Sequence, residues 1–211
     1  TLLKIIAGIS FPYEGHLRYK EREVTSINTD VGFITQDSNL FPWLTLIENV
    51  ELSLKIRGVP KEERQRMAQT FIDMMQLTGF ERHYPFELSG GMQKRCSIIR
   101  TLIYDPDIIL MDEPFGPLDA QTRMLLQDEL LRIWDKNQKT ILFVTHDLTE
   151  AIALSDKVVL FTQRPGRVKR VFDIPLTRPR NVFEIHNQKG FTETYHEIWQ
   201  YFKTEIKVRG G

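Results

Sequence analysis

Short runs of apolar and β-branched residues alternate with longer helical segments along this chain of 211 residues. The residue pattern favours strands at 31–35, 108–111, 140–145 and 157–162, and the segments between them carry helical periodicity. Parallel strands need long connections, usually helices, so strands separated by helices predict parallel pairing. The sequence therefore predicts an α/β fold, in which helices cover both faces of a mainly parallel sheet and the strands, 140–145 included, are buried.

A region dominated by helices interrupts this alternation, and we interpret residues 38–100 as a helical subdomain inserted between strands. Thr45 followed by Glu48 predicts a capping box at the start of one of its helices. From residue 164 onward the chain becomes basic and carries several prolines. Residues 164–211 are therefore interpreted as a C-terminal extension that ends in an appended helix over 183–207.

The composition narrows the classes of partner. Lys and Arg total 28 and Asp and Glu also total 28, so the formal net charge is zero and a nucleic-acid partner is not expected. The only cysteine, Cys96, excludes an intrachain disulfide. No apolar run reaches the roughly 18 residues that a membrane-spanning helix requires, and the first residues lack a signal-peptide pattern. Any membrane role would therefore act through partner subunits.

Two acidic residues, Asp112 and Glu113, end the apolar strand at 108–111. Burying two adjacent acids without partners is costly, and their side chains diverge at a strand end. One carboxylate can then hold Mg²⁺ while the other polarises a water molecule; the alternative is a surface strand end with two solvated acids. The Ser-Gly-Gly sequence at 89–91 precedes a helix, and its hydroxyl and backbone N–H groups suit an anion.

Leu-Ser-Gly-Gly-Met at 88–92 and Ile-Ile-Leu-Met-Asp-Glu at 108–113 resemble the signature motif and the Walker B strand of ABC-type ATPases. The resemblance covers nearly all of residues 1–211 and implies a P-loop NTPase-like fold that binds ATP and Mg²⁺. It also implies that Asp112 holds Mg²⁺ through water and that Glu113 is the general base of hydrolysis.

The same resemblance assigns roles to several further positions. Gln36 matches the Q-loop glutamine and would reach both the metal and the attacking water. His146, in Thr-His-Asp, matches the switch histidine that contacts the γ-phosphate, although a histidine at a strand end is more often structural. Asp119 matches the D-loop, which crosses the axis of a head-to-tail dimer with two composite sites. In that dimer the signature residues of one subunit cap the ATP of the other: Ser89, Gly90 and Gly91.

A phosphate-binding loop of the form G-x-x-x-x-G-K-[ST] does not occur in the printed residues. The opening residues, Thr-Leu-Leu-Lys-Ile-Ile-Ala-Gly, resemble the segment that follows that loop directly, which implies that Thr1 lies beside the nucleotide. The sequence therefore looks cut just downstream of its Walker A element. Since that loop supplies the main phosphate contacts, we expect the chain by itself to be inactive.

Further stretches resemble one branch of the family, the bacterial importers of nitrate, sulfonate and taurine. They are Leu-Phe-Pro-Trp-Leu-Thr at 40–45, Met92 in the signature, Asp-Glu-Pro-Phe-Gly at 112–116, Arg-Pro-Gly-Arg at 164–167 and Arg-Pro-Arg at 178–180. The resemblance implies a peripheral ATPase subunit on the cytoplasmic face of the inner membrane. Its partners would be a second ATPase subunit, a membrane permease and, indirectly, a solute-binding protein.

The sequence leaves several alternatives open. Phe41 and Trp43 either border a groove that receives a helix of the permease or belong to the core of the helical subdomain. Met92 and Lys94 depart from the commonest signature, in which both positions hold glutamine. A soluble ABC ATPase of translation or DNA repair usually carries two nucleotide domains or long coiled-coil insertions, and neither occurs here. A truncated ABC domain that serves as an interaction module without ATP turnover is the other alternative.

Overall fold

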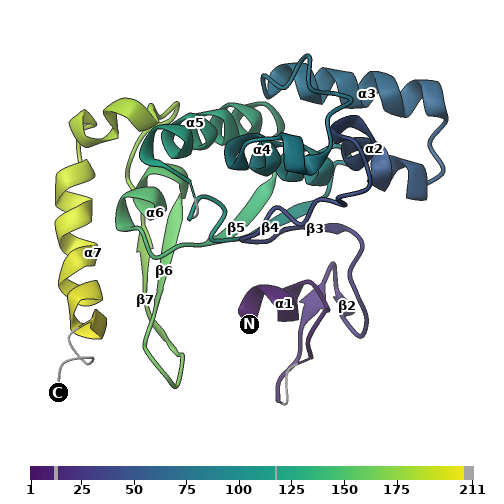
Figure 1. Cartoon of the computed structure of the whole chain (residues 1–211). Coiled ribbons are helices and arrows are strands. Elements are labelled where there is room, and N and C mark those ends of the chain that lie inside the picture. The colour runs from purple at the N-terminus through teal and green to yellow at the C-terminus, as the bar shows by residue number, and fades with distance from the viewer. Residues whose placement is uncertain (12–13, 117, 207–211) are drawn as a thin grey trace. The chain divides into compact units, whose positions relative to one another are not determined.

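The computed structural model describes residues 1–11, 14–116 and 118–206 (Figure 1). The chain divides into two compact units: residues 1–122 together with 138–144, and residues 123–137 together with 145–211. Within the described part of the chain, no helix combines the length and the apolar character needed to cross a membrane.

The first unit is built on a sheet of three parallel strands in the order β3, β4, β5 (Figure 1). The predicted parallel pairing is confirmed for these three strands, and the central strand β4 buries Leu110 completely. It is wrong for the predicted strand at 157–162, which lies outside this sheet and pairs antiparallel. The expectation that the strand at 140–145 is buried is wrong, because Leu142 and Val144 of β5 are 36% and 43% exposed. The exposed residues alternate along β5, at 140, 142 and 144, so they share one face of the strand. The strands span β3 (Val31–Ile34), β4 (Ile108–Asp112) and β5 (Thr140–Val144).

The helices of the first unit follow their sequence signals. The predicted capping box is present, since the Glu48 carboxylate accepts hydrogen bonds from the Thr45 N–H at 2.8 Å and from the Thr45 hydroxyl at 2.9 Å. These bonds hold the pKa of Glu48 below its usual range. Helix α2 packs against α3 and α4, whereas the boundaries 38–100 of a helical subdomain stay a prediction. The helices span α1 (Leu2–Ile6), α2 (Leu46–Ile56), α3 (Lys61–Met74), the short 3₁₀ helix η1 (Pro85–Glu87) and α4 (Gly90–Leu102).

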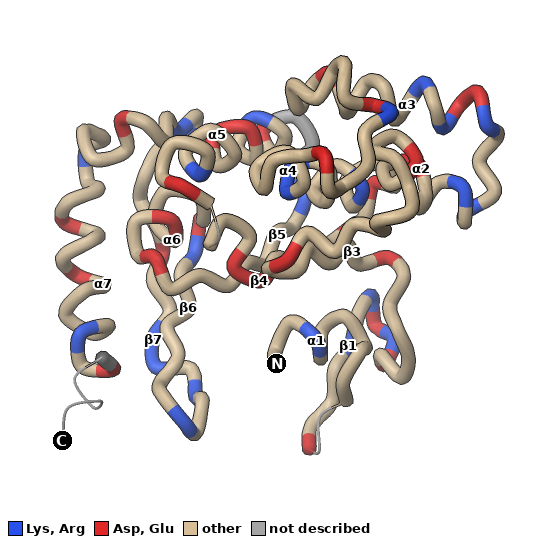
Figure 2. Tube along the Cα trace, viewed as in Figure 1, with Lys and Arg blue, Asp and Glu red and all other residues tan. Residues whose placement is uncertain are grey.

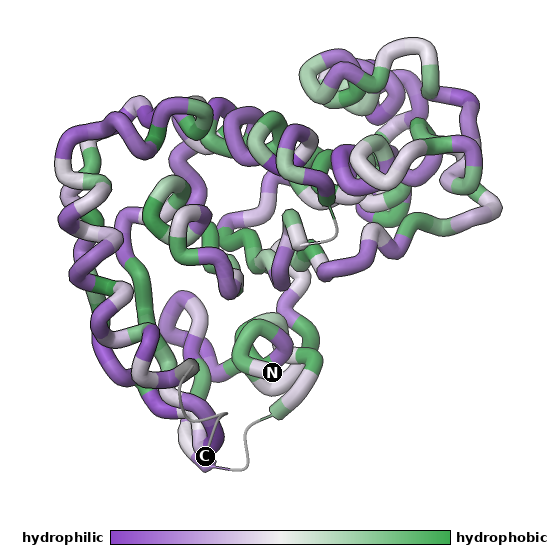
Figure 3. Tube along the Cα trace, turned by 60° about the vertical axis from the view of Figure 1, so that its left-hand side comes forward, coloured by the Kyte–Doolittle hydropathy of each residue, from purple (hydrophilic) through white to green (hydrophobic). Residues whose placement is uncertain are grey.

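Alternate residues of β3 face different helices. Val31 joins Leu3 of α1 and Leu110 of β4 in one apolar cluster, and α1 is mostly hydrophobic in Figure 3. At the next position, a Cβ on Gly32 would lie 2.6 Å from the Thr101 side chain of α4, so only glycine permits this close approach. Helices therefore lie on both faces of β3, as predicted for the sheet. Acidic and basic residues are mixed in the first turns of helix α3 (Figure 2).

A small antiparallel hairpin, β1 (Arg18–Tyr19) and β2 (Arg22–Glu23), completes the first unit. The second unit contains most of helix α5 and an antiparallel pair, β6 with β7. Strand β7 was not expected from the sequence. The predicted single helix over 183–207 is instead a 3₁₀ helix and an α-helix, separated by a turn in which Gly190 has a φ of +90°. The boundaries 164–211 of a C-terminal extension stay a prediction. The elements span α5 (Ala120–Asn137), α6 (Leu148–Leu154), β6 (Lys157–Phe161), β7 (Val168–Asp173), η2 (Val182–Asn187) and α7 (Phe191–Ile206).

Candidate functional site

The end of strand β4 carries the two predicted acids. Asp112 and Glu113 are both half-buried, which does not fit the alternative of a fully solvated strand end. The Glu113 N–H donates to the Val144 carbonyl at 2.9 Å, and Glu113 then adopts a φ of +43°. That left-handed conformation is costly for a residue other than glycine and turns the chain sharply here. The two carboxylates are therefore held at a tightly turned strand end.

Gln36 follows strand β3, which is the parallel neighbour of β4. In parallel strands the carboxyl ends meet at one edge of the sheet, and the register places Ile34 beside Met111. The exposed Gln36 side chain accordingly approaches the acids: its Nε2 lies 3.5 Å from Glu113 Oε2, at the limit of a hydrogen bond. The structure thus brings together two residues that are 77 positions apart in the sequence.

The Ser-Gly-Gly sequence begins helix α4. Ser89 is the N-cap, and its hydroxyl oxygen accepts a hydrogen bond from the Met92 N–H at 3.3 Å. Open space surrounds Gly90, so its backbone can be approached by a ligand. Gly91 has a packing role that the sequence did not reveal, because a Cβ there would lie 2.8 Å from the Thr122 side chain of α5. The first N–H groups of α4 have no acceptor within the helix and remain suited to an anion.

A hollow of about 380 Å³ joins this helix start to Asp119. Asp119 caps α5, since its Oδ1 accepts from the Thr122 N–H at 3.0 Å, and this bond lowers the pKa of the Asp119 carboxyl. A second hollow of about 360 Å³ extends from Gln36 to the same helix start. Gly90 and Leu118 line both hollows, so the predicted Q-loop, signature and D-loop residues gather around the start of α4.

Lys94 lies one turn further along α4 and was not predicted as a site residue. Its side chain is only 1% exposed, and its Nζ donates to the carbonyls of Thr35 at 2.7 Å and Gln36 at 3.0 Å. Burial lowers the pKa of this ammonium group to about 8. The signal was present in the sequence, because position 94 shares a helical face with the buried Ile98 and Thr101.

His146 lies in the second unit and is exposed. The turn that carries it is fixed by its neighbours: the Thr145 hydroxyl donates to Glu150 Oε2 at 2.5 Å and accepts from the Asp147 N–H at 3.0 Å. Glu150 is buried, also accepts from Gln127 Nε2 at 2.8 Å, and has a raised pKa because of its burial. Glu150 therefore supports the histidine turn, a role that sequence reasoning missed.

The remaining predicted residues are less constrained. Thr1 is exposed, its carbonyl accepts from the Ile5 N–H at 3.1 Å, and it lines neither hollow beside α4.

Among the described residues, no group of three or more His, Cys, Asp or Glu side chains could hold a metal ion. Gln36 and Asp112, at the ends of neighbouring strands, offer the oxygen ligands that Mg²⁺ prefers. Mg²⁺ takes few protein ligands and completes its shell with phosphates and water, so these residues fit it.

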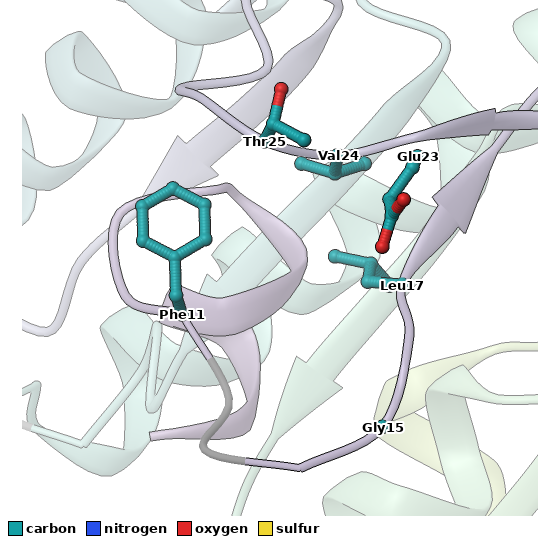
Figure 4. Close-up of a pocket in the computed structure, with 6 residues that line it drawn as sticks. All are labelled: Phe11, Gly15, Leu17, Glu23, Val24 and Thr25. Carbon is teal, nitrogen blue, oxygen red and sulfur yellow. The ribbon is translucent and has the colours of Figure 1, made fainter.

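A third hollow, of about 260 Å³, lies beside the small hairpin β1–β2. Figure 4 shows Phe11 and Thr25 at one end of it and the side chains of Leu17, Val24 and Glu23 facing it. None of the predicted site residues lines this hollow.

The chain is similar to proteins of known family. A family model described as ABC transporter matches residues 1–116. An uncharacterised ABC transporter ATP-binding protein of Methanocaldococcus jannaschii is 49% identical over 98% of this chain and 76% of the relative. The aliphatic sulfonates import ATP-binding protein SsuB of Bacillus cereus is 42% identical over 96% of this chain and 78% of the relative.

Solved structures give the same result for the fold. An ATP-binding cassette in a dimeric post-hydrolysis state, bound to ADP and Pi, superposes with a TM-score of 0.71 at 32% identity. The superposition covers 82% of this chain and 79% of the cassette. A second dimeric structure of a bacterial ABC transporter cassette has a TM-score of 0.72. The architecture around β3, β4 and α4 is therefore that of a P-loop NTPase-like cassette.

Proposed function

We propose, since this chain belongs to the ABC transporter family of ATP-binding proteins, that it is the ATP-hydrolysing subunit of an importer for a small anionic solute. The observation that carries the proposal is the approach of Gln36 to Glu113 beside the start of α4. The similarity to SsuB, named for the import of aliphatic sulfonates, supports a sulfonate-like solute; nitrate and taurine remain in the same class.

In the proposed mechanism Glu113 accepts the proton of the attacking water, and the Gln36 amide orients that water from the neighbouring strand. Asp112 and Gln36 would hold Mg²⁺, which neutralises developing charge on the phosphates when it is bound. His146, on its braced turn, would contact the γ-phosphate. Glu113 suits a general base because its backbone turn and its hydrogen-bonded neighbour restrict its side chain.

The proposal includes a second ATPase subunit arranged head to tail. The hydroxyl of Ser89 and the first N–H groups of α4 would face the ATP of the partner subunit, with Asp119 beside the dimer axis. The importer would further contain a membrane permease, on whose cytoplasmic side this subunit binds peripherally, and a solute-binding protein that delivers the solute.

The first test is Glu113→Gln in a protein that carries these residues together with a phosphate-binding loop and is assembled with its permease. We expect ATP turnover to fall by at least about 100-fold, because a general base contributes that much or more, while ATP binding persists. Glu62→Gln, on the exposed surface of α3, is the matched control and should keep wild-type turnover. Turnover of Glu113→Gln close to that of the wild type would contradict the assignment.

A second test addresses the solute. ATP turnover of the reconstituted importer is measured with its binding protein and an alkanesulfonate, taurine or nitrate in turn. We expect stimulation by one of these three solutes and none by an analogue of similar size that lacks the sulfonate or nitrate group. Turnover that responds to no anion would contradict the proposed solute class, and ATP binding without turnover in the wild type would contradict the proposed hydrolysis.

A further inference from the structure

Lys94 is a buried cation that contacts main chain from another part of the molecule. It lies on α4, five residues after the N-cap Ser89, and reaches the end of strand β3. Its Nζ donates to the carbonyls of Thr35 and Gln36, at 2.7 Å and 3.0 Å. One ammonium group therefore holds two consecutive peptide units at the point where the chain leaves the sheet.

Burying the Lys94 ammonium group costs free energy, and the hydrogen bonds it makes must offset that cost. An ammonium group loses its hydration on burial, and here neutral carbonyls replace the water while Asp37 acts only as a more distant charge. An apolar residue of similar length would fill the same space without that cost. The polar link thus constrains the Gln36 backbone more specifically than packing alone could do.

A second basic residue of α4 holds the same segment further along. Arg100 donates to the carbonyl of Asn39 at 2.9 Å and to that of Ser38 at 3.2 Å. The segment 35–39 is thereby attached at both ends to a single rigid helix. The helix begins with the signature residues, and the segment carries the Gln36 side chain to within 3.5 Å of Glu113.

We propose that Lys94 is a positioning residue that couples the signature end of α4 to Gln36, so that a displacement of the helix moves the Gln36 carboxamide relative to Glu113. The inference rests on the proposed function, because it concerns the same ATPase site. It links the signature, which would face the partner's ATP, to the glutamine of the subunit's own site. Lys94 acts only through the backbone of Thr35 and Gln36.

The test is a double-mutant cycle on ATP turnover in the assembled importer. Lys94→Met should lower kcat by about 10-fold and leave KM for ATP within about threefold, because small displacements of catalytic groups reduce the rate strongly. If Lys94 acts through Gln36, the double variant Lys94→Met/Gln36→Ala should be no slower than Gln36→Ala alone. Independent losses that multiply in the double variant would overturn the inference.

Two further variants separate positioning from general damage. Lys94→Gln keeps a side-chain NH2 group that can donate to the carbonyls, and it should recover part of kcat. Lys61→Met, which replaces an exposed lysine of α3, should leave kcat unchanged. A kcat for Lys94→Gln as low as that of Lys94→Met, with both variants folded, would contradict the role of the hydrogen bonds.

Amide hydrogen exchange distinguishes this inference from the proposed function. Without nucleotide, Lys94→Met should exchange faster than the wild type at amides 36–39, with no change in helix α2 (Leu46–Ile56). Unchanged exchange at 36–39 would overturn the Lys94 inference and leave the proposed function intact. Absence of ATP turnover in the wild type would overturn the proposed function, whatever the exchange result.

Discussion

Among the residues that the structure describes, each of the two units buries one basic side chain against main-chain carbonyls, and the two side chains bind different parts of the fold. Lys94, in the first unit, is 1% exposed, and Arg180, in the second unit, is 6% exposed. Lys94 binds the carbonyls of Thr35 and Gln36 at the end of a strand. The Arg180 guanidinium instead binds carbonyls at the end of a helix, those of Ile152, Ala153 and Ser155, together with that of Leu176.

The chemistry of arginine suits the contacts of Arg180, and that of lysine suits the contacts of Lys94. The last carbonyls of α6 receive no hydrogen bond from within the helix. A planar guanidinium has several donors for them, and its positive charge interacts favourably with the negative end of the helix dipole. Burial lowers the pKa of Arg180, but an arginine remains charged throughout the physiological range. A lysine offers a compact head that titrates when it is buried. Arg180 therefore binds its carbonyls as a cation throughout the physiological pH range, whereas loss of the Lys94 proton can weaken the Lys94 contact.

The largest stability effect is expected for Arg180→Leu. Removing the guanidinium leaves buried carbonyls at the end of α6 without donors, which should lower the free energy of unfolding by about 3–5 kcal/mol. Urea unfolding followed by circular dichroism measures it. Arg170→Leu, which removes an exposed arginine of β7, is the control and should lower the free energy of unfolding far less. A loss below about 1 kcal/mol for Arg180→Leu would show that its contacts are dispensable.

A smaller effect, and one that depends on pH, is expected at Lys94. Its pKa is about 8 in the folded protein and 10.5 as an ordinary lysine, so between these pH values the unfolded chain binds more protons. The free energy of unfolding of the wild type should therefore rise relative to Lys94→Met as the pH increases from 8 to 10.5, by roughly 1–3 kcal/mol.

Measuring the free energy of unfolding of Arg180→Leu over the same pH range tests whether the two buried cations differ. Since arginine keeps its proton over this range, the difference between the wild type and Arg180→Leu should stay constant from pH 8 to 10 within about 0.5 kcal/mol. A constant difference for Lys94→Met as well would mean that Lys94 does not titrate in this window, and the two buried cations would then be physically equivalent.

The sequence predicted the elements whose signals are local. Strand β4 with its terminal acids, the capping box at Thr45 and the Ser89 start of α4 all appear where expected, because apolar runs and caps depend on neighbouring residues. The approach of Gln36 to Glu113 followed from parallel pairing and the family resemblance. These features need no knowledge of distant contacts beyond the order of the strands.

Features that depend on distant partners were missed. Strand β7 is recognisable only by its pairing with β6, since its sequence, Val-Lys-Arg-Val-Phe-Asp, lacks the regular alternation of apolar and polar residues that indicates a strand. The exposed face of β5 depends on which distant elements pack over it. Gly91 reads as an anion-binding glycine, but its closeness to Thr122 is a tertiary contact. Lys94 was missed although it shares a helical face with Ile98 and Thr101, because a charged residue is ordinarily assigned to the surface.

The smallest effect is expected for Arg178→Lys, two residues before Arg180. The Arg178 guanidinium lies over the Trp134 ring, 3.8 Å from its centroid, and also donates to Asp156 Oδ1 at 3.0 Å. Its side chain is 20% exposed, so lysine can keep the charge near Asp156 while losing the planar stacking. We expect a loss of about 0.5–1.5 kcal/mol in urea unfolding. A loss as large as that of Arg180→Leu would mean that stacking on Trp134, rather than the number of buried carbonyls satisfied, determines how much a buried arginine stabilises this unit.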